Sequence, residues 1–247
     1  MNTLRNALEE LSIEYDDIKI EKLSMFSEEI LKSSKKFNLT GLKTREEIRD
    51  TLFIRSLRYA HIINSKYSAL NLLENKALKI LDIGTGAGIP SIPIKIFYPE
   101  INLFLCESSK KKCEFLSDTI EKLDLKNIEI NNQRAEVLGQ SKLRESFDLI
   151  LTRALAKLPT LAELTIPLLK IGGIVVTAKG NYPSKEIKDS RYIIRILGIS
   201  KNISETIEIP PFLPKDNFII WEKMNNSPKI YPRRDGMPKK NPIIQEQ

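Results

Sequence analysis

The sequence has little cysteine, a single histidine and no long apolar run. Its two cysteines, Cys106 and Cys113, belong neither to a CxxC pair nor to a Cys/His cluster, which argues against a disulfide scaffold and against a metal site. No run reaches the roughly 18 apolar residues of a membrane span, so we expect no membrane partner. Residues 1–11 include acids and no apolar stretch, unlike a signal peptide. We therefore expect a cytoplasmic protein without a metal, in which His61 is a surface or packing residue.

The net charge is positive. Lys and Arg number 39 and Asp and Glu number 32, which gives a formal charge of +7. Clustered cations gain free energy by releasing counterions condensed on nucleic acid, so this surplus is compatible with an RNA or DNA partner. A lysine-rich but merely solvated surface would give the same total. The charge alone leaves both interpretations open.

The chain divides into three stretches of different character. Residues 1–76 have apolar side chains at helical spacing and are predicted to form an N-terminal helical extension. Residues 77–224 alternate short β-branched runs with amphipathic ones, which predicts an α/β domain with a doubly wound, mostly parallel Rossmann-like sheet. At its end, the strand-like runs 204–209 and 217–223 have no helix between them and predict an antiparallel pair at one sheet edge. Residues 225–247 are rich in Pro, Lys, Arg and Asn and are predicted to be a basic C-terminal arm.

The strands and helices of the α/β stretch are short. We expect strands at 79–83, 102–106, 128–130, 147–151 and 174–178, and helices at about 110–123, 161–169 and 184–197. A turn at Gly172-Gly173 is expected to lead into the last of these strands.

A glycine-rich loop follows the first expected strand. Residues 82–89 read DIGTGAGI, so the third glycine falls one place earlier than in the GxGxxG loop of dinucleotide-binding folds. Glycines at such a turn permit positive φ and close approach of the backbone to a ligand. Pro90 and Pro93 follow in the first helical turn and remove amides that could hold a phosphate. The loop therefore favours S-adenosylmethionine, which has no phosphate, over NAD.

An acid stands where a ribose ligand is expected. Glu107 follows the second expected strand and lies 19 residues after Gly88, close to the ~20-residue offset at which an acid binds ribose hydroxyls. NAD enzymes share this offset, so it identifies a ribose and not the whole cofactor. A lone glutamate at a strand end is otherwise a solvated residue. Beside this loop, we interpret Glu107 as a ribose ligand.

The order of the motifs resembles one bacterial family, ribosomal RNA small subunit methyltransferase G, also called glucose-inhibited division protein B. The similar segments are NLT at 38–40, LDIGTGAGIPSIP at 81–93, RAE at 134–136, TRA at 152–154, GG at 172–173, AKG at 178–180 and YPRRDGMP at 231–238. The double-proline loop together with the terminal PRR segment makes the resemblance specific. Ile89 and Ser91 stand where the family usually has Phe and Gly, and the histidine usual near residues 53–57 is absent.

The resemblance implies S-adenosylmethionine as the cofactor and methylation of N7 of a guanine in 16S rRNA as the activity. The substrate would be 16S rRNA itself or a small-subunit ribosomal particle. The implied cofactor-binding residues are Gly84, Ile89, Glu107, Ala135, Glu136 and Arg153. Ala135 and Glu136 follow the third strand, where adenine typically lies. Arg153 follows the fourth strand and could reach the methionine carboxylate or an RNA phosphate.

Cations and an aromatic side chain are expected to hold the RNA. The candidates are Lys179, after the fifth strand, and Tyr231, Arg233, Arg234, Lys239 and Lys240 of the arm. Gly236 and Pro238 interrupt the arm, so we expect an extended segment without a regular helix. Because nothing in the arm resembles a cofactor motif, we also expect cofactor binding to be independent of it. A disordered, solubilising tail is the alternative.

No residue is assigned as catalytic. Methylation of an exocyclic amine usually goes with an Asn/Asp-Pro-Pro-aromatic segment after the fourth strand, but residues 152–155 read TRAL; the IPPF at 209–212 lies far downstream and is expected to be a turn. Methylation of a pyrimidine carbon normally needs a cysteine nucleophile, and Cys106 and Cys113 lie in a strand and on a helix. Guanine N7 has an in-plane lone pair and no proton, so alignment with the methyl group suffices without a general base. A methyltransferase acting on a protein or small molecule, and a catalytically inactive cofactor-binding module, stay open as alternatives.

Overall fold

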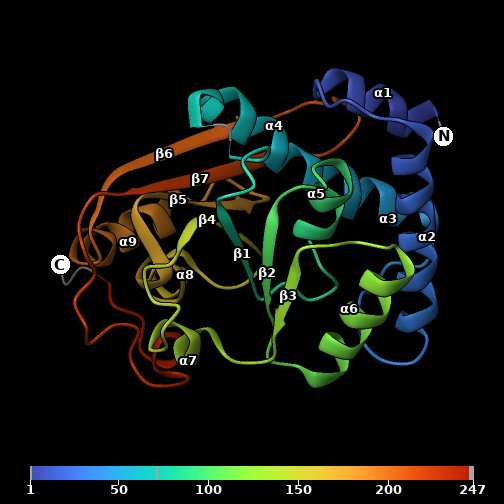
Figure 1. Ribbon diagram of the computed structural model, residues 1–247. Coiled ribbons are helices and arrows are strands. Elements are labelled where there is room, and N and C mark those ends of the chain that lie inside the picture. The colour runs from blue at the N-terminus through green and yellow to red at the C-terminus, as the bar shows by residue number, and fades with distance from the viewer. Residues whose placement is uncertain (1, 71, 245–247) are drawn as a thin grey trace.

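A mixed seven-stranded sheet forms the centre of the protein in the computed structural model, which describes residues 2–70 and 72–244 (Figure 1). The strand order is β3-β2-β1-β4-β5-β7-β6. The strands are β1 (Lys79–Ile83), β2 (Asn102–Cys106), β3 (Ile128–Asn131), β4 (Phe147–Arg153), β5 (Leu169–Lys179), β6 (Ile199–Ile207) and β7 (Asp216–Lys223). Strands β1 to β5 pair in parallel, and β7 pairs antiparallel with both β5 and β6. The predicted α/β class and antiparallel edge pair are confirmed.

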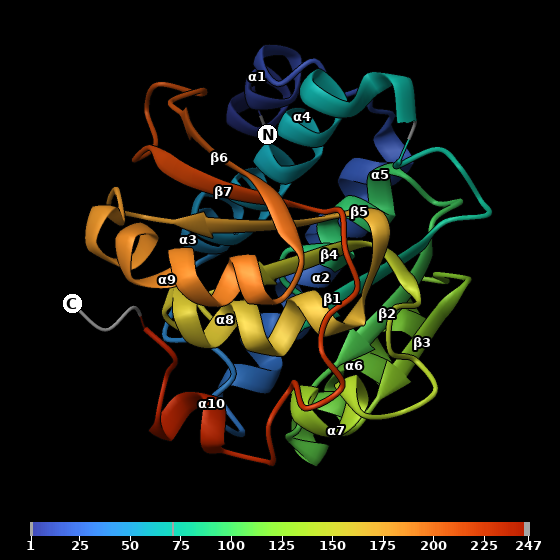
Figure 2. The same ribbon diagram turned by 90° about the vertical axis from the view of Figure 1, so that its left-hand side faces the viewer.

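Helices cover both faces of this sheet (Figures 1 and 2). One face carries α1 (Asn2–Glu10), α2 (Asp17–Ser34), α3 (Arg45–Ile48), a π-helical segment (Arg49–Ile54), α4 (Arg55–Tyr67), α5 (Ser91–Phe97) and α6 (Lys110–Lys122). The other face carries α7 (Ala135–Gly139), α8 (Leu158–Thr165) and α9 (Ser184–Ile196), and α10 (Met237–Lys240) lies beside α8. Short 3-10 turns occupy Ser68–Leu70 and Ile166–Leu168.

The central strands are apolar because both of their faces are buried. Side chains alternate between the two faces along a strand, so neighbouring residues enter different hydrophobic clusters. Leu149 and Leu151 belong to the cluster that includes residues of α4 and α5, whereas Ile150 between them belongs to the cluster that includes residues of α8. The parallel strands β1 to β5 present their carboxyl ends on the same side of the molecule.

The N-terminal helices pack on the sheet in one continuous core. Tyr59 of α4 is fully buried; its hydroxyl donates to the Thr152 carbonyl at 2.7 Å and accepts from the Ala178 amide at 3.0 Å. This side chain thus spans the ends of β4 and β5. The division of the chain into a helical extension up to residue 76 and an α/β domain after it stays a prediction.

Two expectations about local structure are wrong. Residues 172–173 do not form a turn before the strand, because β5 already begins at Leu169 and continues through them with a register irregularity against β4. A Cβ at Gly173 would lie 2.9 Å from the Asp148 carbonyl oxygen. Any larger residue would therefore clash with the β4 backbone at this position. The C-terminal arm is also not free of helix, since residues 237–240 form α10, which begins directly after Gly236 and contains Pro238 in its first turn.

Candidate cofactor site

A cavity of about 210 Å³ lies at the carboxyl ends of β1 and β2 and the start of α7. Ligands of open α/β sheets bind at this edge. Four of the six predicted cofactor residues line it: Gly84, Glu107, Ala135 and Glu136. The structure thus brings together residues that follow three separate strands, of which Glu107 was predicted from its offset and Ala135 and Glu136 from the family resemblance.

The glycine loop closes tightly over one side of the cavity. Gly84 and Gly86 have φ of +68° and +60°, a conformation that side chains disfavour. A Cβ on Gly84 would lie only 2.6 Å from Cδ1 of Leu155, which also lines the cavity. The loop amides are already used inside the protein: Gly84 donates to the Cys106 carbonyl at 2.8 Å, and Gly88 donates to the Thr85 carbonyl at 2.9 Å.

Glu107 connects this loop to the start of α6. One of its carboxylate oxygens accepts from the Gly86 amide at 3.0 Å, and the other accepts from the Ser109 amide at 2.8 Å. The residue is buried, with 7% of its surface exposed. Each carboxylate oxygen has two lone pairs, so a second acceptor position stays available on each oxygen. Glu107 can therefore set the shape of the loop and still accept from a ligand hydroxyl.

Ala135 and Glu136 form the first turn of α7, and both are buried. The Oε1 atom of Glu136 accepts from the amide of Gly236 at 3.0 Å. Gly236 and Lys239, from the C-terminal arm, line the same cavity. The arm therefore packs against this cavity, although we expected cofactor binding to be independent of it.

Ile89 and Arg153 do not line this cavity. Ile89 is buried in the apolar cluster on the α5 side. Arg153 ends β4 and donates from Nη2 to the Thr51 carbonyl at 2.6 Å, while its buried Nη1 has no hydrogen-bond partner within the described residues. Burial lowers the pKa of Arg153. A buried cationic donor without an acceptor costs free energy, so this position fits an anionic group of a ligand. The cofactor-binding roles of Ile89 and Arg153 stay predictions.

Asp82 is a buried acid that the sequence motifs did not single out. Its Oδ2 accepts from the Thr85 hydroxyl at 2.7 Å and from the Ser91 hydroxyl at 2.6 Å, whereas Oδ1 has no partner among the described residues. Ser91 thus holds this carboxyl group. Burial raises the pKa of Asp82 to about 7. The sequence signal that could have indicated this buried acid is its position inside an otherwise apolar strand.

Replacement of Asp82 by Asn is expected to change the pH dependence of stability. The pKa of Asp82 rises from 3.8 to about 7 on folding, so the folded state binds more protons than the unfolded state between these values. The stability contributed by this group is thus fully present below pH 3.8 and is lost as the pH rises through about 7. We expect the wild type to lose a few kcal/mol relative to Asp82→Asn across this window. Urea unfolding of both proteins at several pH values measures the difference in their free energies of unfolding. A difference that does not change with pH would refute the raised pKa of Asp82.

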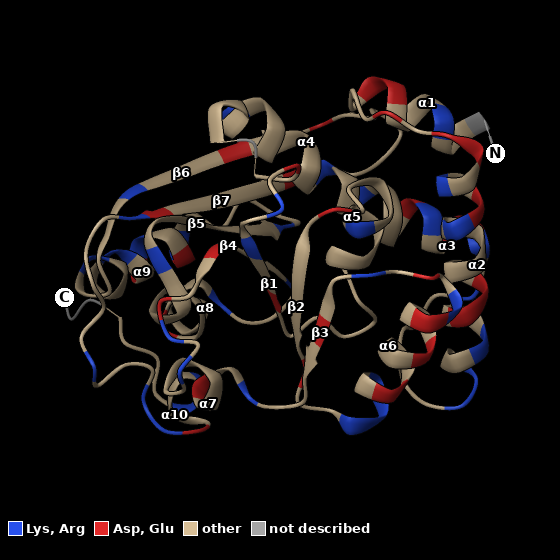
Figure 3. Cartoon of the chain, viewed as in Figure 1, with Lys and Arg blue, Asp and Glu red and all other residues tan. Residues whose placement is uncertain are grey.

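The predicted RNA-binding residues lie in different environments. Lys179 donates to the Ala156 carbonyl at 2.8 Å and pairs with Glu186 at 2.9 Å, and Arg233 pairs with the buried Glu163 at 2.7 Å. Tyr231 is half-buried, whereas the remaining three cations, Arg234, Lys239 and Lys240, are exposed. Figure 3 shows Lys and Arg around α10 and at the start of α6, on the side where the strands end. The RNA roles stay predictions, and the exposed residues are the better candidates.

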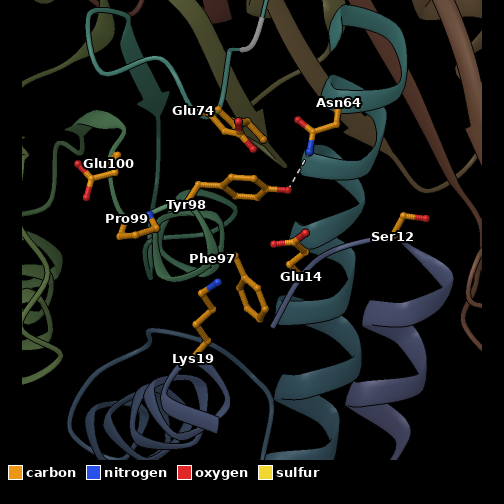
Figure 4. A pocket seen from close by; sticks show the side chains of 10 residues that line it. Ser12, Glu14, Lys19, Asn64, Glu74, Phe97, Tyr98, Pro99 and Glu100 are labelled. Atoms are coloured by element: carbon orange, nitrogen blue, oxygen red, sulfur yellow. Dashed lines mark hydrogen bonds between the residues drawn. The ribbon is translucent and has the colours of Figure 1, made fainter. Parts of the chain in front are cut away.

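A larger cavity lies at the opposite end of the strands. It measures about 350 Å³ and is lined by residues from the turn after α1, from α4 and from the loops before β1 and β2 (Figure 4). Asn64 donates to the Tyr98 hydroxyl at 2.8 Å across it. Because it lies at the amino ends of the strands, away from Gly84 and Glu107, we do not assign the cofactor to it.

Within the part of the chain that the structure describes, no group of three or more His, Cys, Asp and Glu side chains is arranged to hold a metal ion. No helix in the same residues has the length and apolar character of a membrane span.

Comparison with known proteins agrees with the resemblance found in the sequence. A family model described as rRNA small subunit methyltransferase G matches residues 19–208. Curated proteins named Ribosomal RNA small subunit methyltransferase G from Bacillus cereus and Bacillus mycoides are each 32% identical over 240 residues, which covers 97% of both chains. A crystal structure of an MtNAS mutant has a TM-score of 0.52 at 13% identity, covering 84% of this chain and 75% of that chain, and supports the fold alone. The chain therefore belongs to the rRNA small subunit methyltransferase G family, a family of S-adenosylmethionine-dependent methyltransferases.

Proposed function

We propose that this protein transfers a methyl group from S-adenosylmethionine to N7 of a guanine in small-subunit ribosomal RNA. One observation carries the proposal. In a chain of this family, the cavity at the strand ends brings together the positive-φ glycine loop, Glu107 and the start of α7. The name of the curated relatives indicates ribosomal RNA as the substrate class. The exposed cations beside the cavity fit such a polyanionic substrate.

The loop suits a cofactor without phosphates. The amides of Gly84, Gly86, Gly88 and Ile89 all donate to acceptors within the protein, so they are not free to hold a pyrophosphate. Pro90 has no amide proton to offer. NAD binding in related folds depends on such amides. This arrangement therefore supports S-adenosylmethionine over a dinucleotide.

The residues of the site bind and orient and do not take part in covalent chemistry. When bound, S-adenosylmethionine supplies an electrophilic methyl group on a sulfonium centre. We assign the ribose to Glu107 and the adenine to Ala135 and Glu136. Arg153, which lies outside the cavity, is assigned to an anionic group, either the methionine carboxylate or an RNA phosphate. Since guanine N7 carries no proton, the protein needs no general base for this transfer and acts by alignment.

Neither cysteine is suited to act as a nucleophile. Burial raises the pKa of Cys106 to about 12 and also raises that of Cys113, so both thiols stay protonated near neutral pH. Each thiol donates to a backbone carbonyl at 3.4 Å, Cys106 to Gln133 and Cys113 to Glu107. This supports a transfer without a covalent enzyme intermediate.

Replacement of both Cys106 and Cys113 by Ser is expected to preserve methyl transfer to within a few-fold. The serine hydroxyls can donate to the same carbonyls, and N7 attack needs no thiolate. Initial rates with labelled cofactor and rRNA measure the effect. A folded double variant without turnover would instead indicate carbon methylation through a cysteine.

The proposal is tested by offering purified protein and labelled S-adenosylmethionine to three acceptors: naked 16S rRNA, small-subunit particles and total protein extract. We expect label in the RNA as 7-methylguanosine, from one or both RNA-containing acceptors. Label in protein would instead favour a protein methyltransferase. Tight cofactor binding without transfer to any acceptor would favour an inactive binding module. A cytoplasmic location stays a prediction.

A further inference from the structure

The C-terminal arm is docked on the protein by polar contacts. From the end of β7, the arm passes α7 and reaches α10 (Figure 2). Arg144 donates to the carbonyls of Ser227, at 2.7 Å, and of Tyr231, and Gln140 donates to the Pro232 carbonyl at 2.7 Å. We call residues 227–241 the C-terminal clasp. Its low apolar content does not prevent docking, because side chains of the domain satisfy its backbone carbonyls.

A buried ion pair fixes the middle of the clasp. Glu163 lies on α8, and its side chain is only 1% exposed. Its carboxylate accepts from the Arg233 backbone amide at 2.7 Å, from Nε at 2.9 Å and from Nη2 at 2.7 Å. Within the described residues, Arg233 is the only hydrogen-bond partner of this carboxylate. A buried carboxylate without its partner is strongly unfavourable, so Glu163 requires the docked clasp.

Three residues beyond this ion pair, the clasp reaches the candidate cofactor cavity. Gly236, with φ of +76°, donates its amide to Glu136, and the Pro238 carbonyl accepts from the Thr160 hydroxyl at 3.0 Å. Gly236 and Lys239 line the cavity together with Glu107 and Glu136. The clasp therefore supplies one wall of the site and engages the carboxylate to which we assign the adenine.

We infer that the C-terminal clasp forms part of the cofactor site and is needed for cofactor binding. The ion pair of Arg233 and Glu163 positions the clasp. Cofactor affinity then depends on a segment that lies outside the matched family region, 19–208. The coupling is reciprocal, so bound cofactor stabilises the docked clasp. This inference rests on the proposed function, because it takes the cavity as the S-adenosylmethionine site.

The test replaces Arg233 by Gln and measures S-adenosylmethionine binding by calorimetry. Loss of the guanidinium leaves Glu163 uncompensated and undocks the clasp, so we expect affinity to fall about tenfold or more, within the usual range of coupling between sites. The matched control is Lys229→Gln. Lys229 is an exposed cation of the same clasp, and its side chain makes no hydrogen bond or ion pair within residues 2–70 and 72–244. Its replacement should leave affinity unchanged.

A second measurement needs no variant. Trypsin cleaves after exposed Arg234, Lys239 and Lys240 when the clasp opens, and saturating S-adenosylmethionine should slow cleavage there. Cleavage after Lys76, exposed at the far end of the strands, should not slow and serves as the internal control. If wild-type protein binds no S-adenosylmethionine, the proposed function fails. If the wild type binds but folded Arg233→Gln binds equally well, or if the cofactor does not protect the clasp, the inference is overturned.

Discussion

Replacement of Asp216 by Ala is expected to lower the free energy of unfolding by about 3–5 kcal/mol, the cost of breaking a buried ion pair. Asp216 begins β7 and is 2% exposed, and its carboxylate pairs with Arg55 and with the fully buried Arg58. Arg58 also donates to the carbonyls of Ile209 and Pro214. Without Asp216, the fully buried guanidinium of Arg58 and the half-buried guanidinium of Arg55 would have no counter-charge.

Chemical unfolding of the wild type, Asp216→Ala and a control measures this effect. The control is Asp17→Ala, which removes an ion pair with Arg5 at 2.6 Å. Because the Asp17 side chain is 89% exposed, its loss should cost no more than about 1 kcal/mol. Equal effects of the two substitutions would mean that the ion pairs between α4 and β7 contribute little to stability.

Replacement of Glu107 by Gln is expected to weaken S-adenosylmethionine binding by about 1.5–3 kcal/mol, the contribution of a charged hydrogen bond. The glutamine oxygen can accept from only one of the Gly86 and Ser109 amides, and its NH₂ group would face the other donor. The substitution thus disturbs the loop and also removes the negative charge that we propose binds the ribose hydroxyls.

The control for this variant is Glu114→Gln, an exposed position on α6 whose carboxylate pairs loosely with Lys110 at 3.9 Å. It should bind the cofactor like the wild type. Calorimetry measures the S-adenosylmethionine affinity of both variants, and circular dichroism verifies that they are folded. Unchanged affinity in folded Glu107→Gln would show that this carboxylate does not contact the cofactor.

The central sheet was predictable because its signals are local. β1 and β2 occupy the predicted ranges, since a short apolar run followed by Gly or by an acid marks a buried parallel strand and its end. The offset between Gly88 and Glu107 has the same origin: one helix and one strand of ordinary length separate the loop from the next strand end. Local pattern therefore indicated the glycine loop and Glu107, whereas Ala135 and Glu136 came from the family resemblance. Gly84, Glu107 and these two residues line one cavity.

The long-range polar contacts were not predictable. Arg233 and Glu163 are 70 residues apart and Arg58 and Asp216 are 158 apart, and no periodicity relates such positions. A composition poor in apolar residues suggested a separate arm, whereas hydrogen bonds to its backbone hold it on the domain. One signal was present in α8, where Glu163 interrupts an apolar helix and so requires a buried partner.

The most direct test of the central claim is mass mapping of modified nucleosides in small-subunit rRNA from cells with and without this gene. The account predicts that one 7-methylguanosine is lost without the gene, that the wild-type gene restores it, and that the Glu107→Gln gene restores it poorly. An unchanged nucleoside map in cells without the gene would contradict the assignment of this protein as a guanine-N7 methyltransferase of small-subunit rRNA.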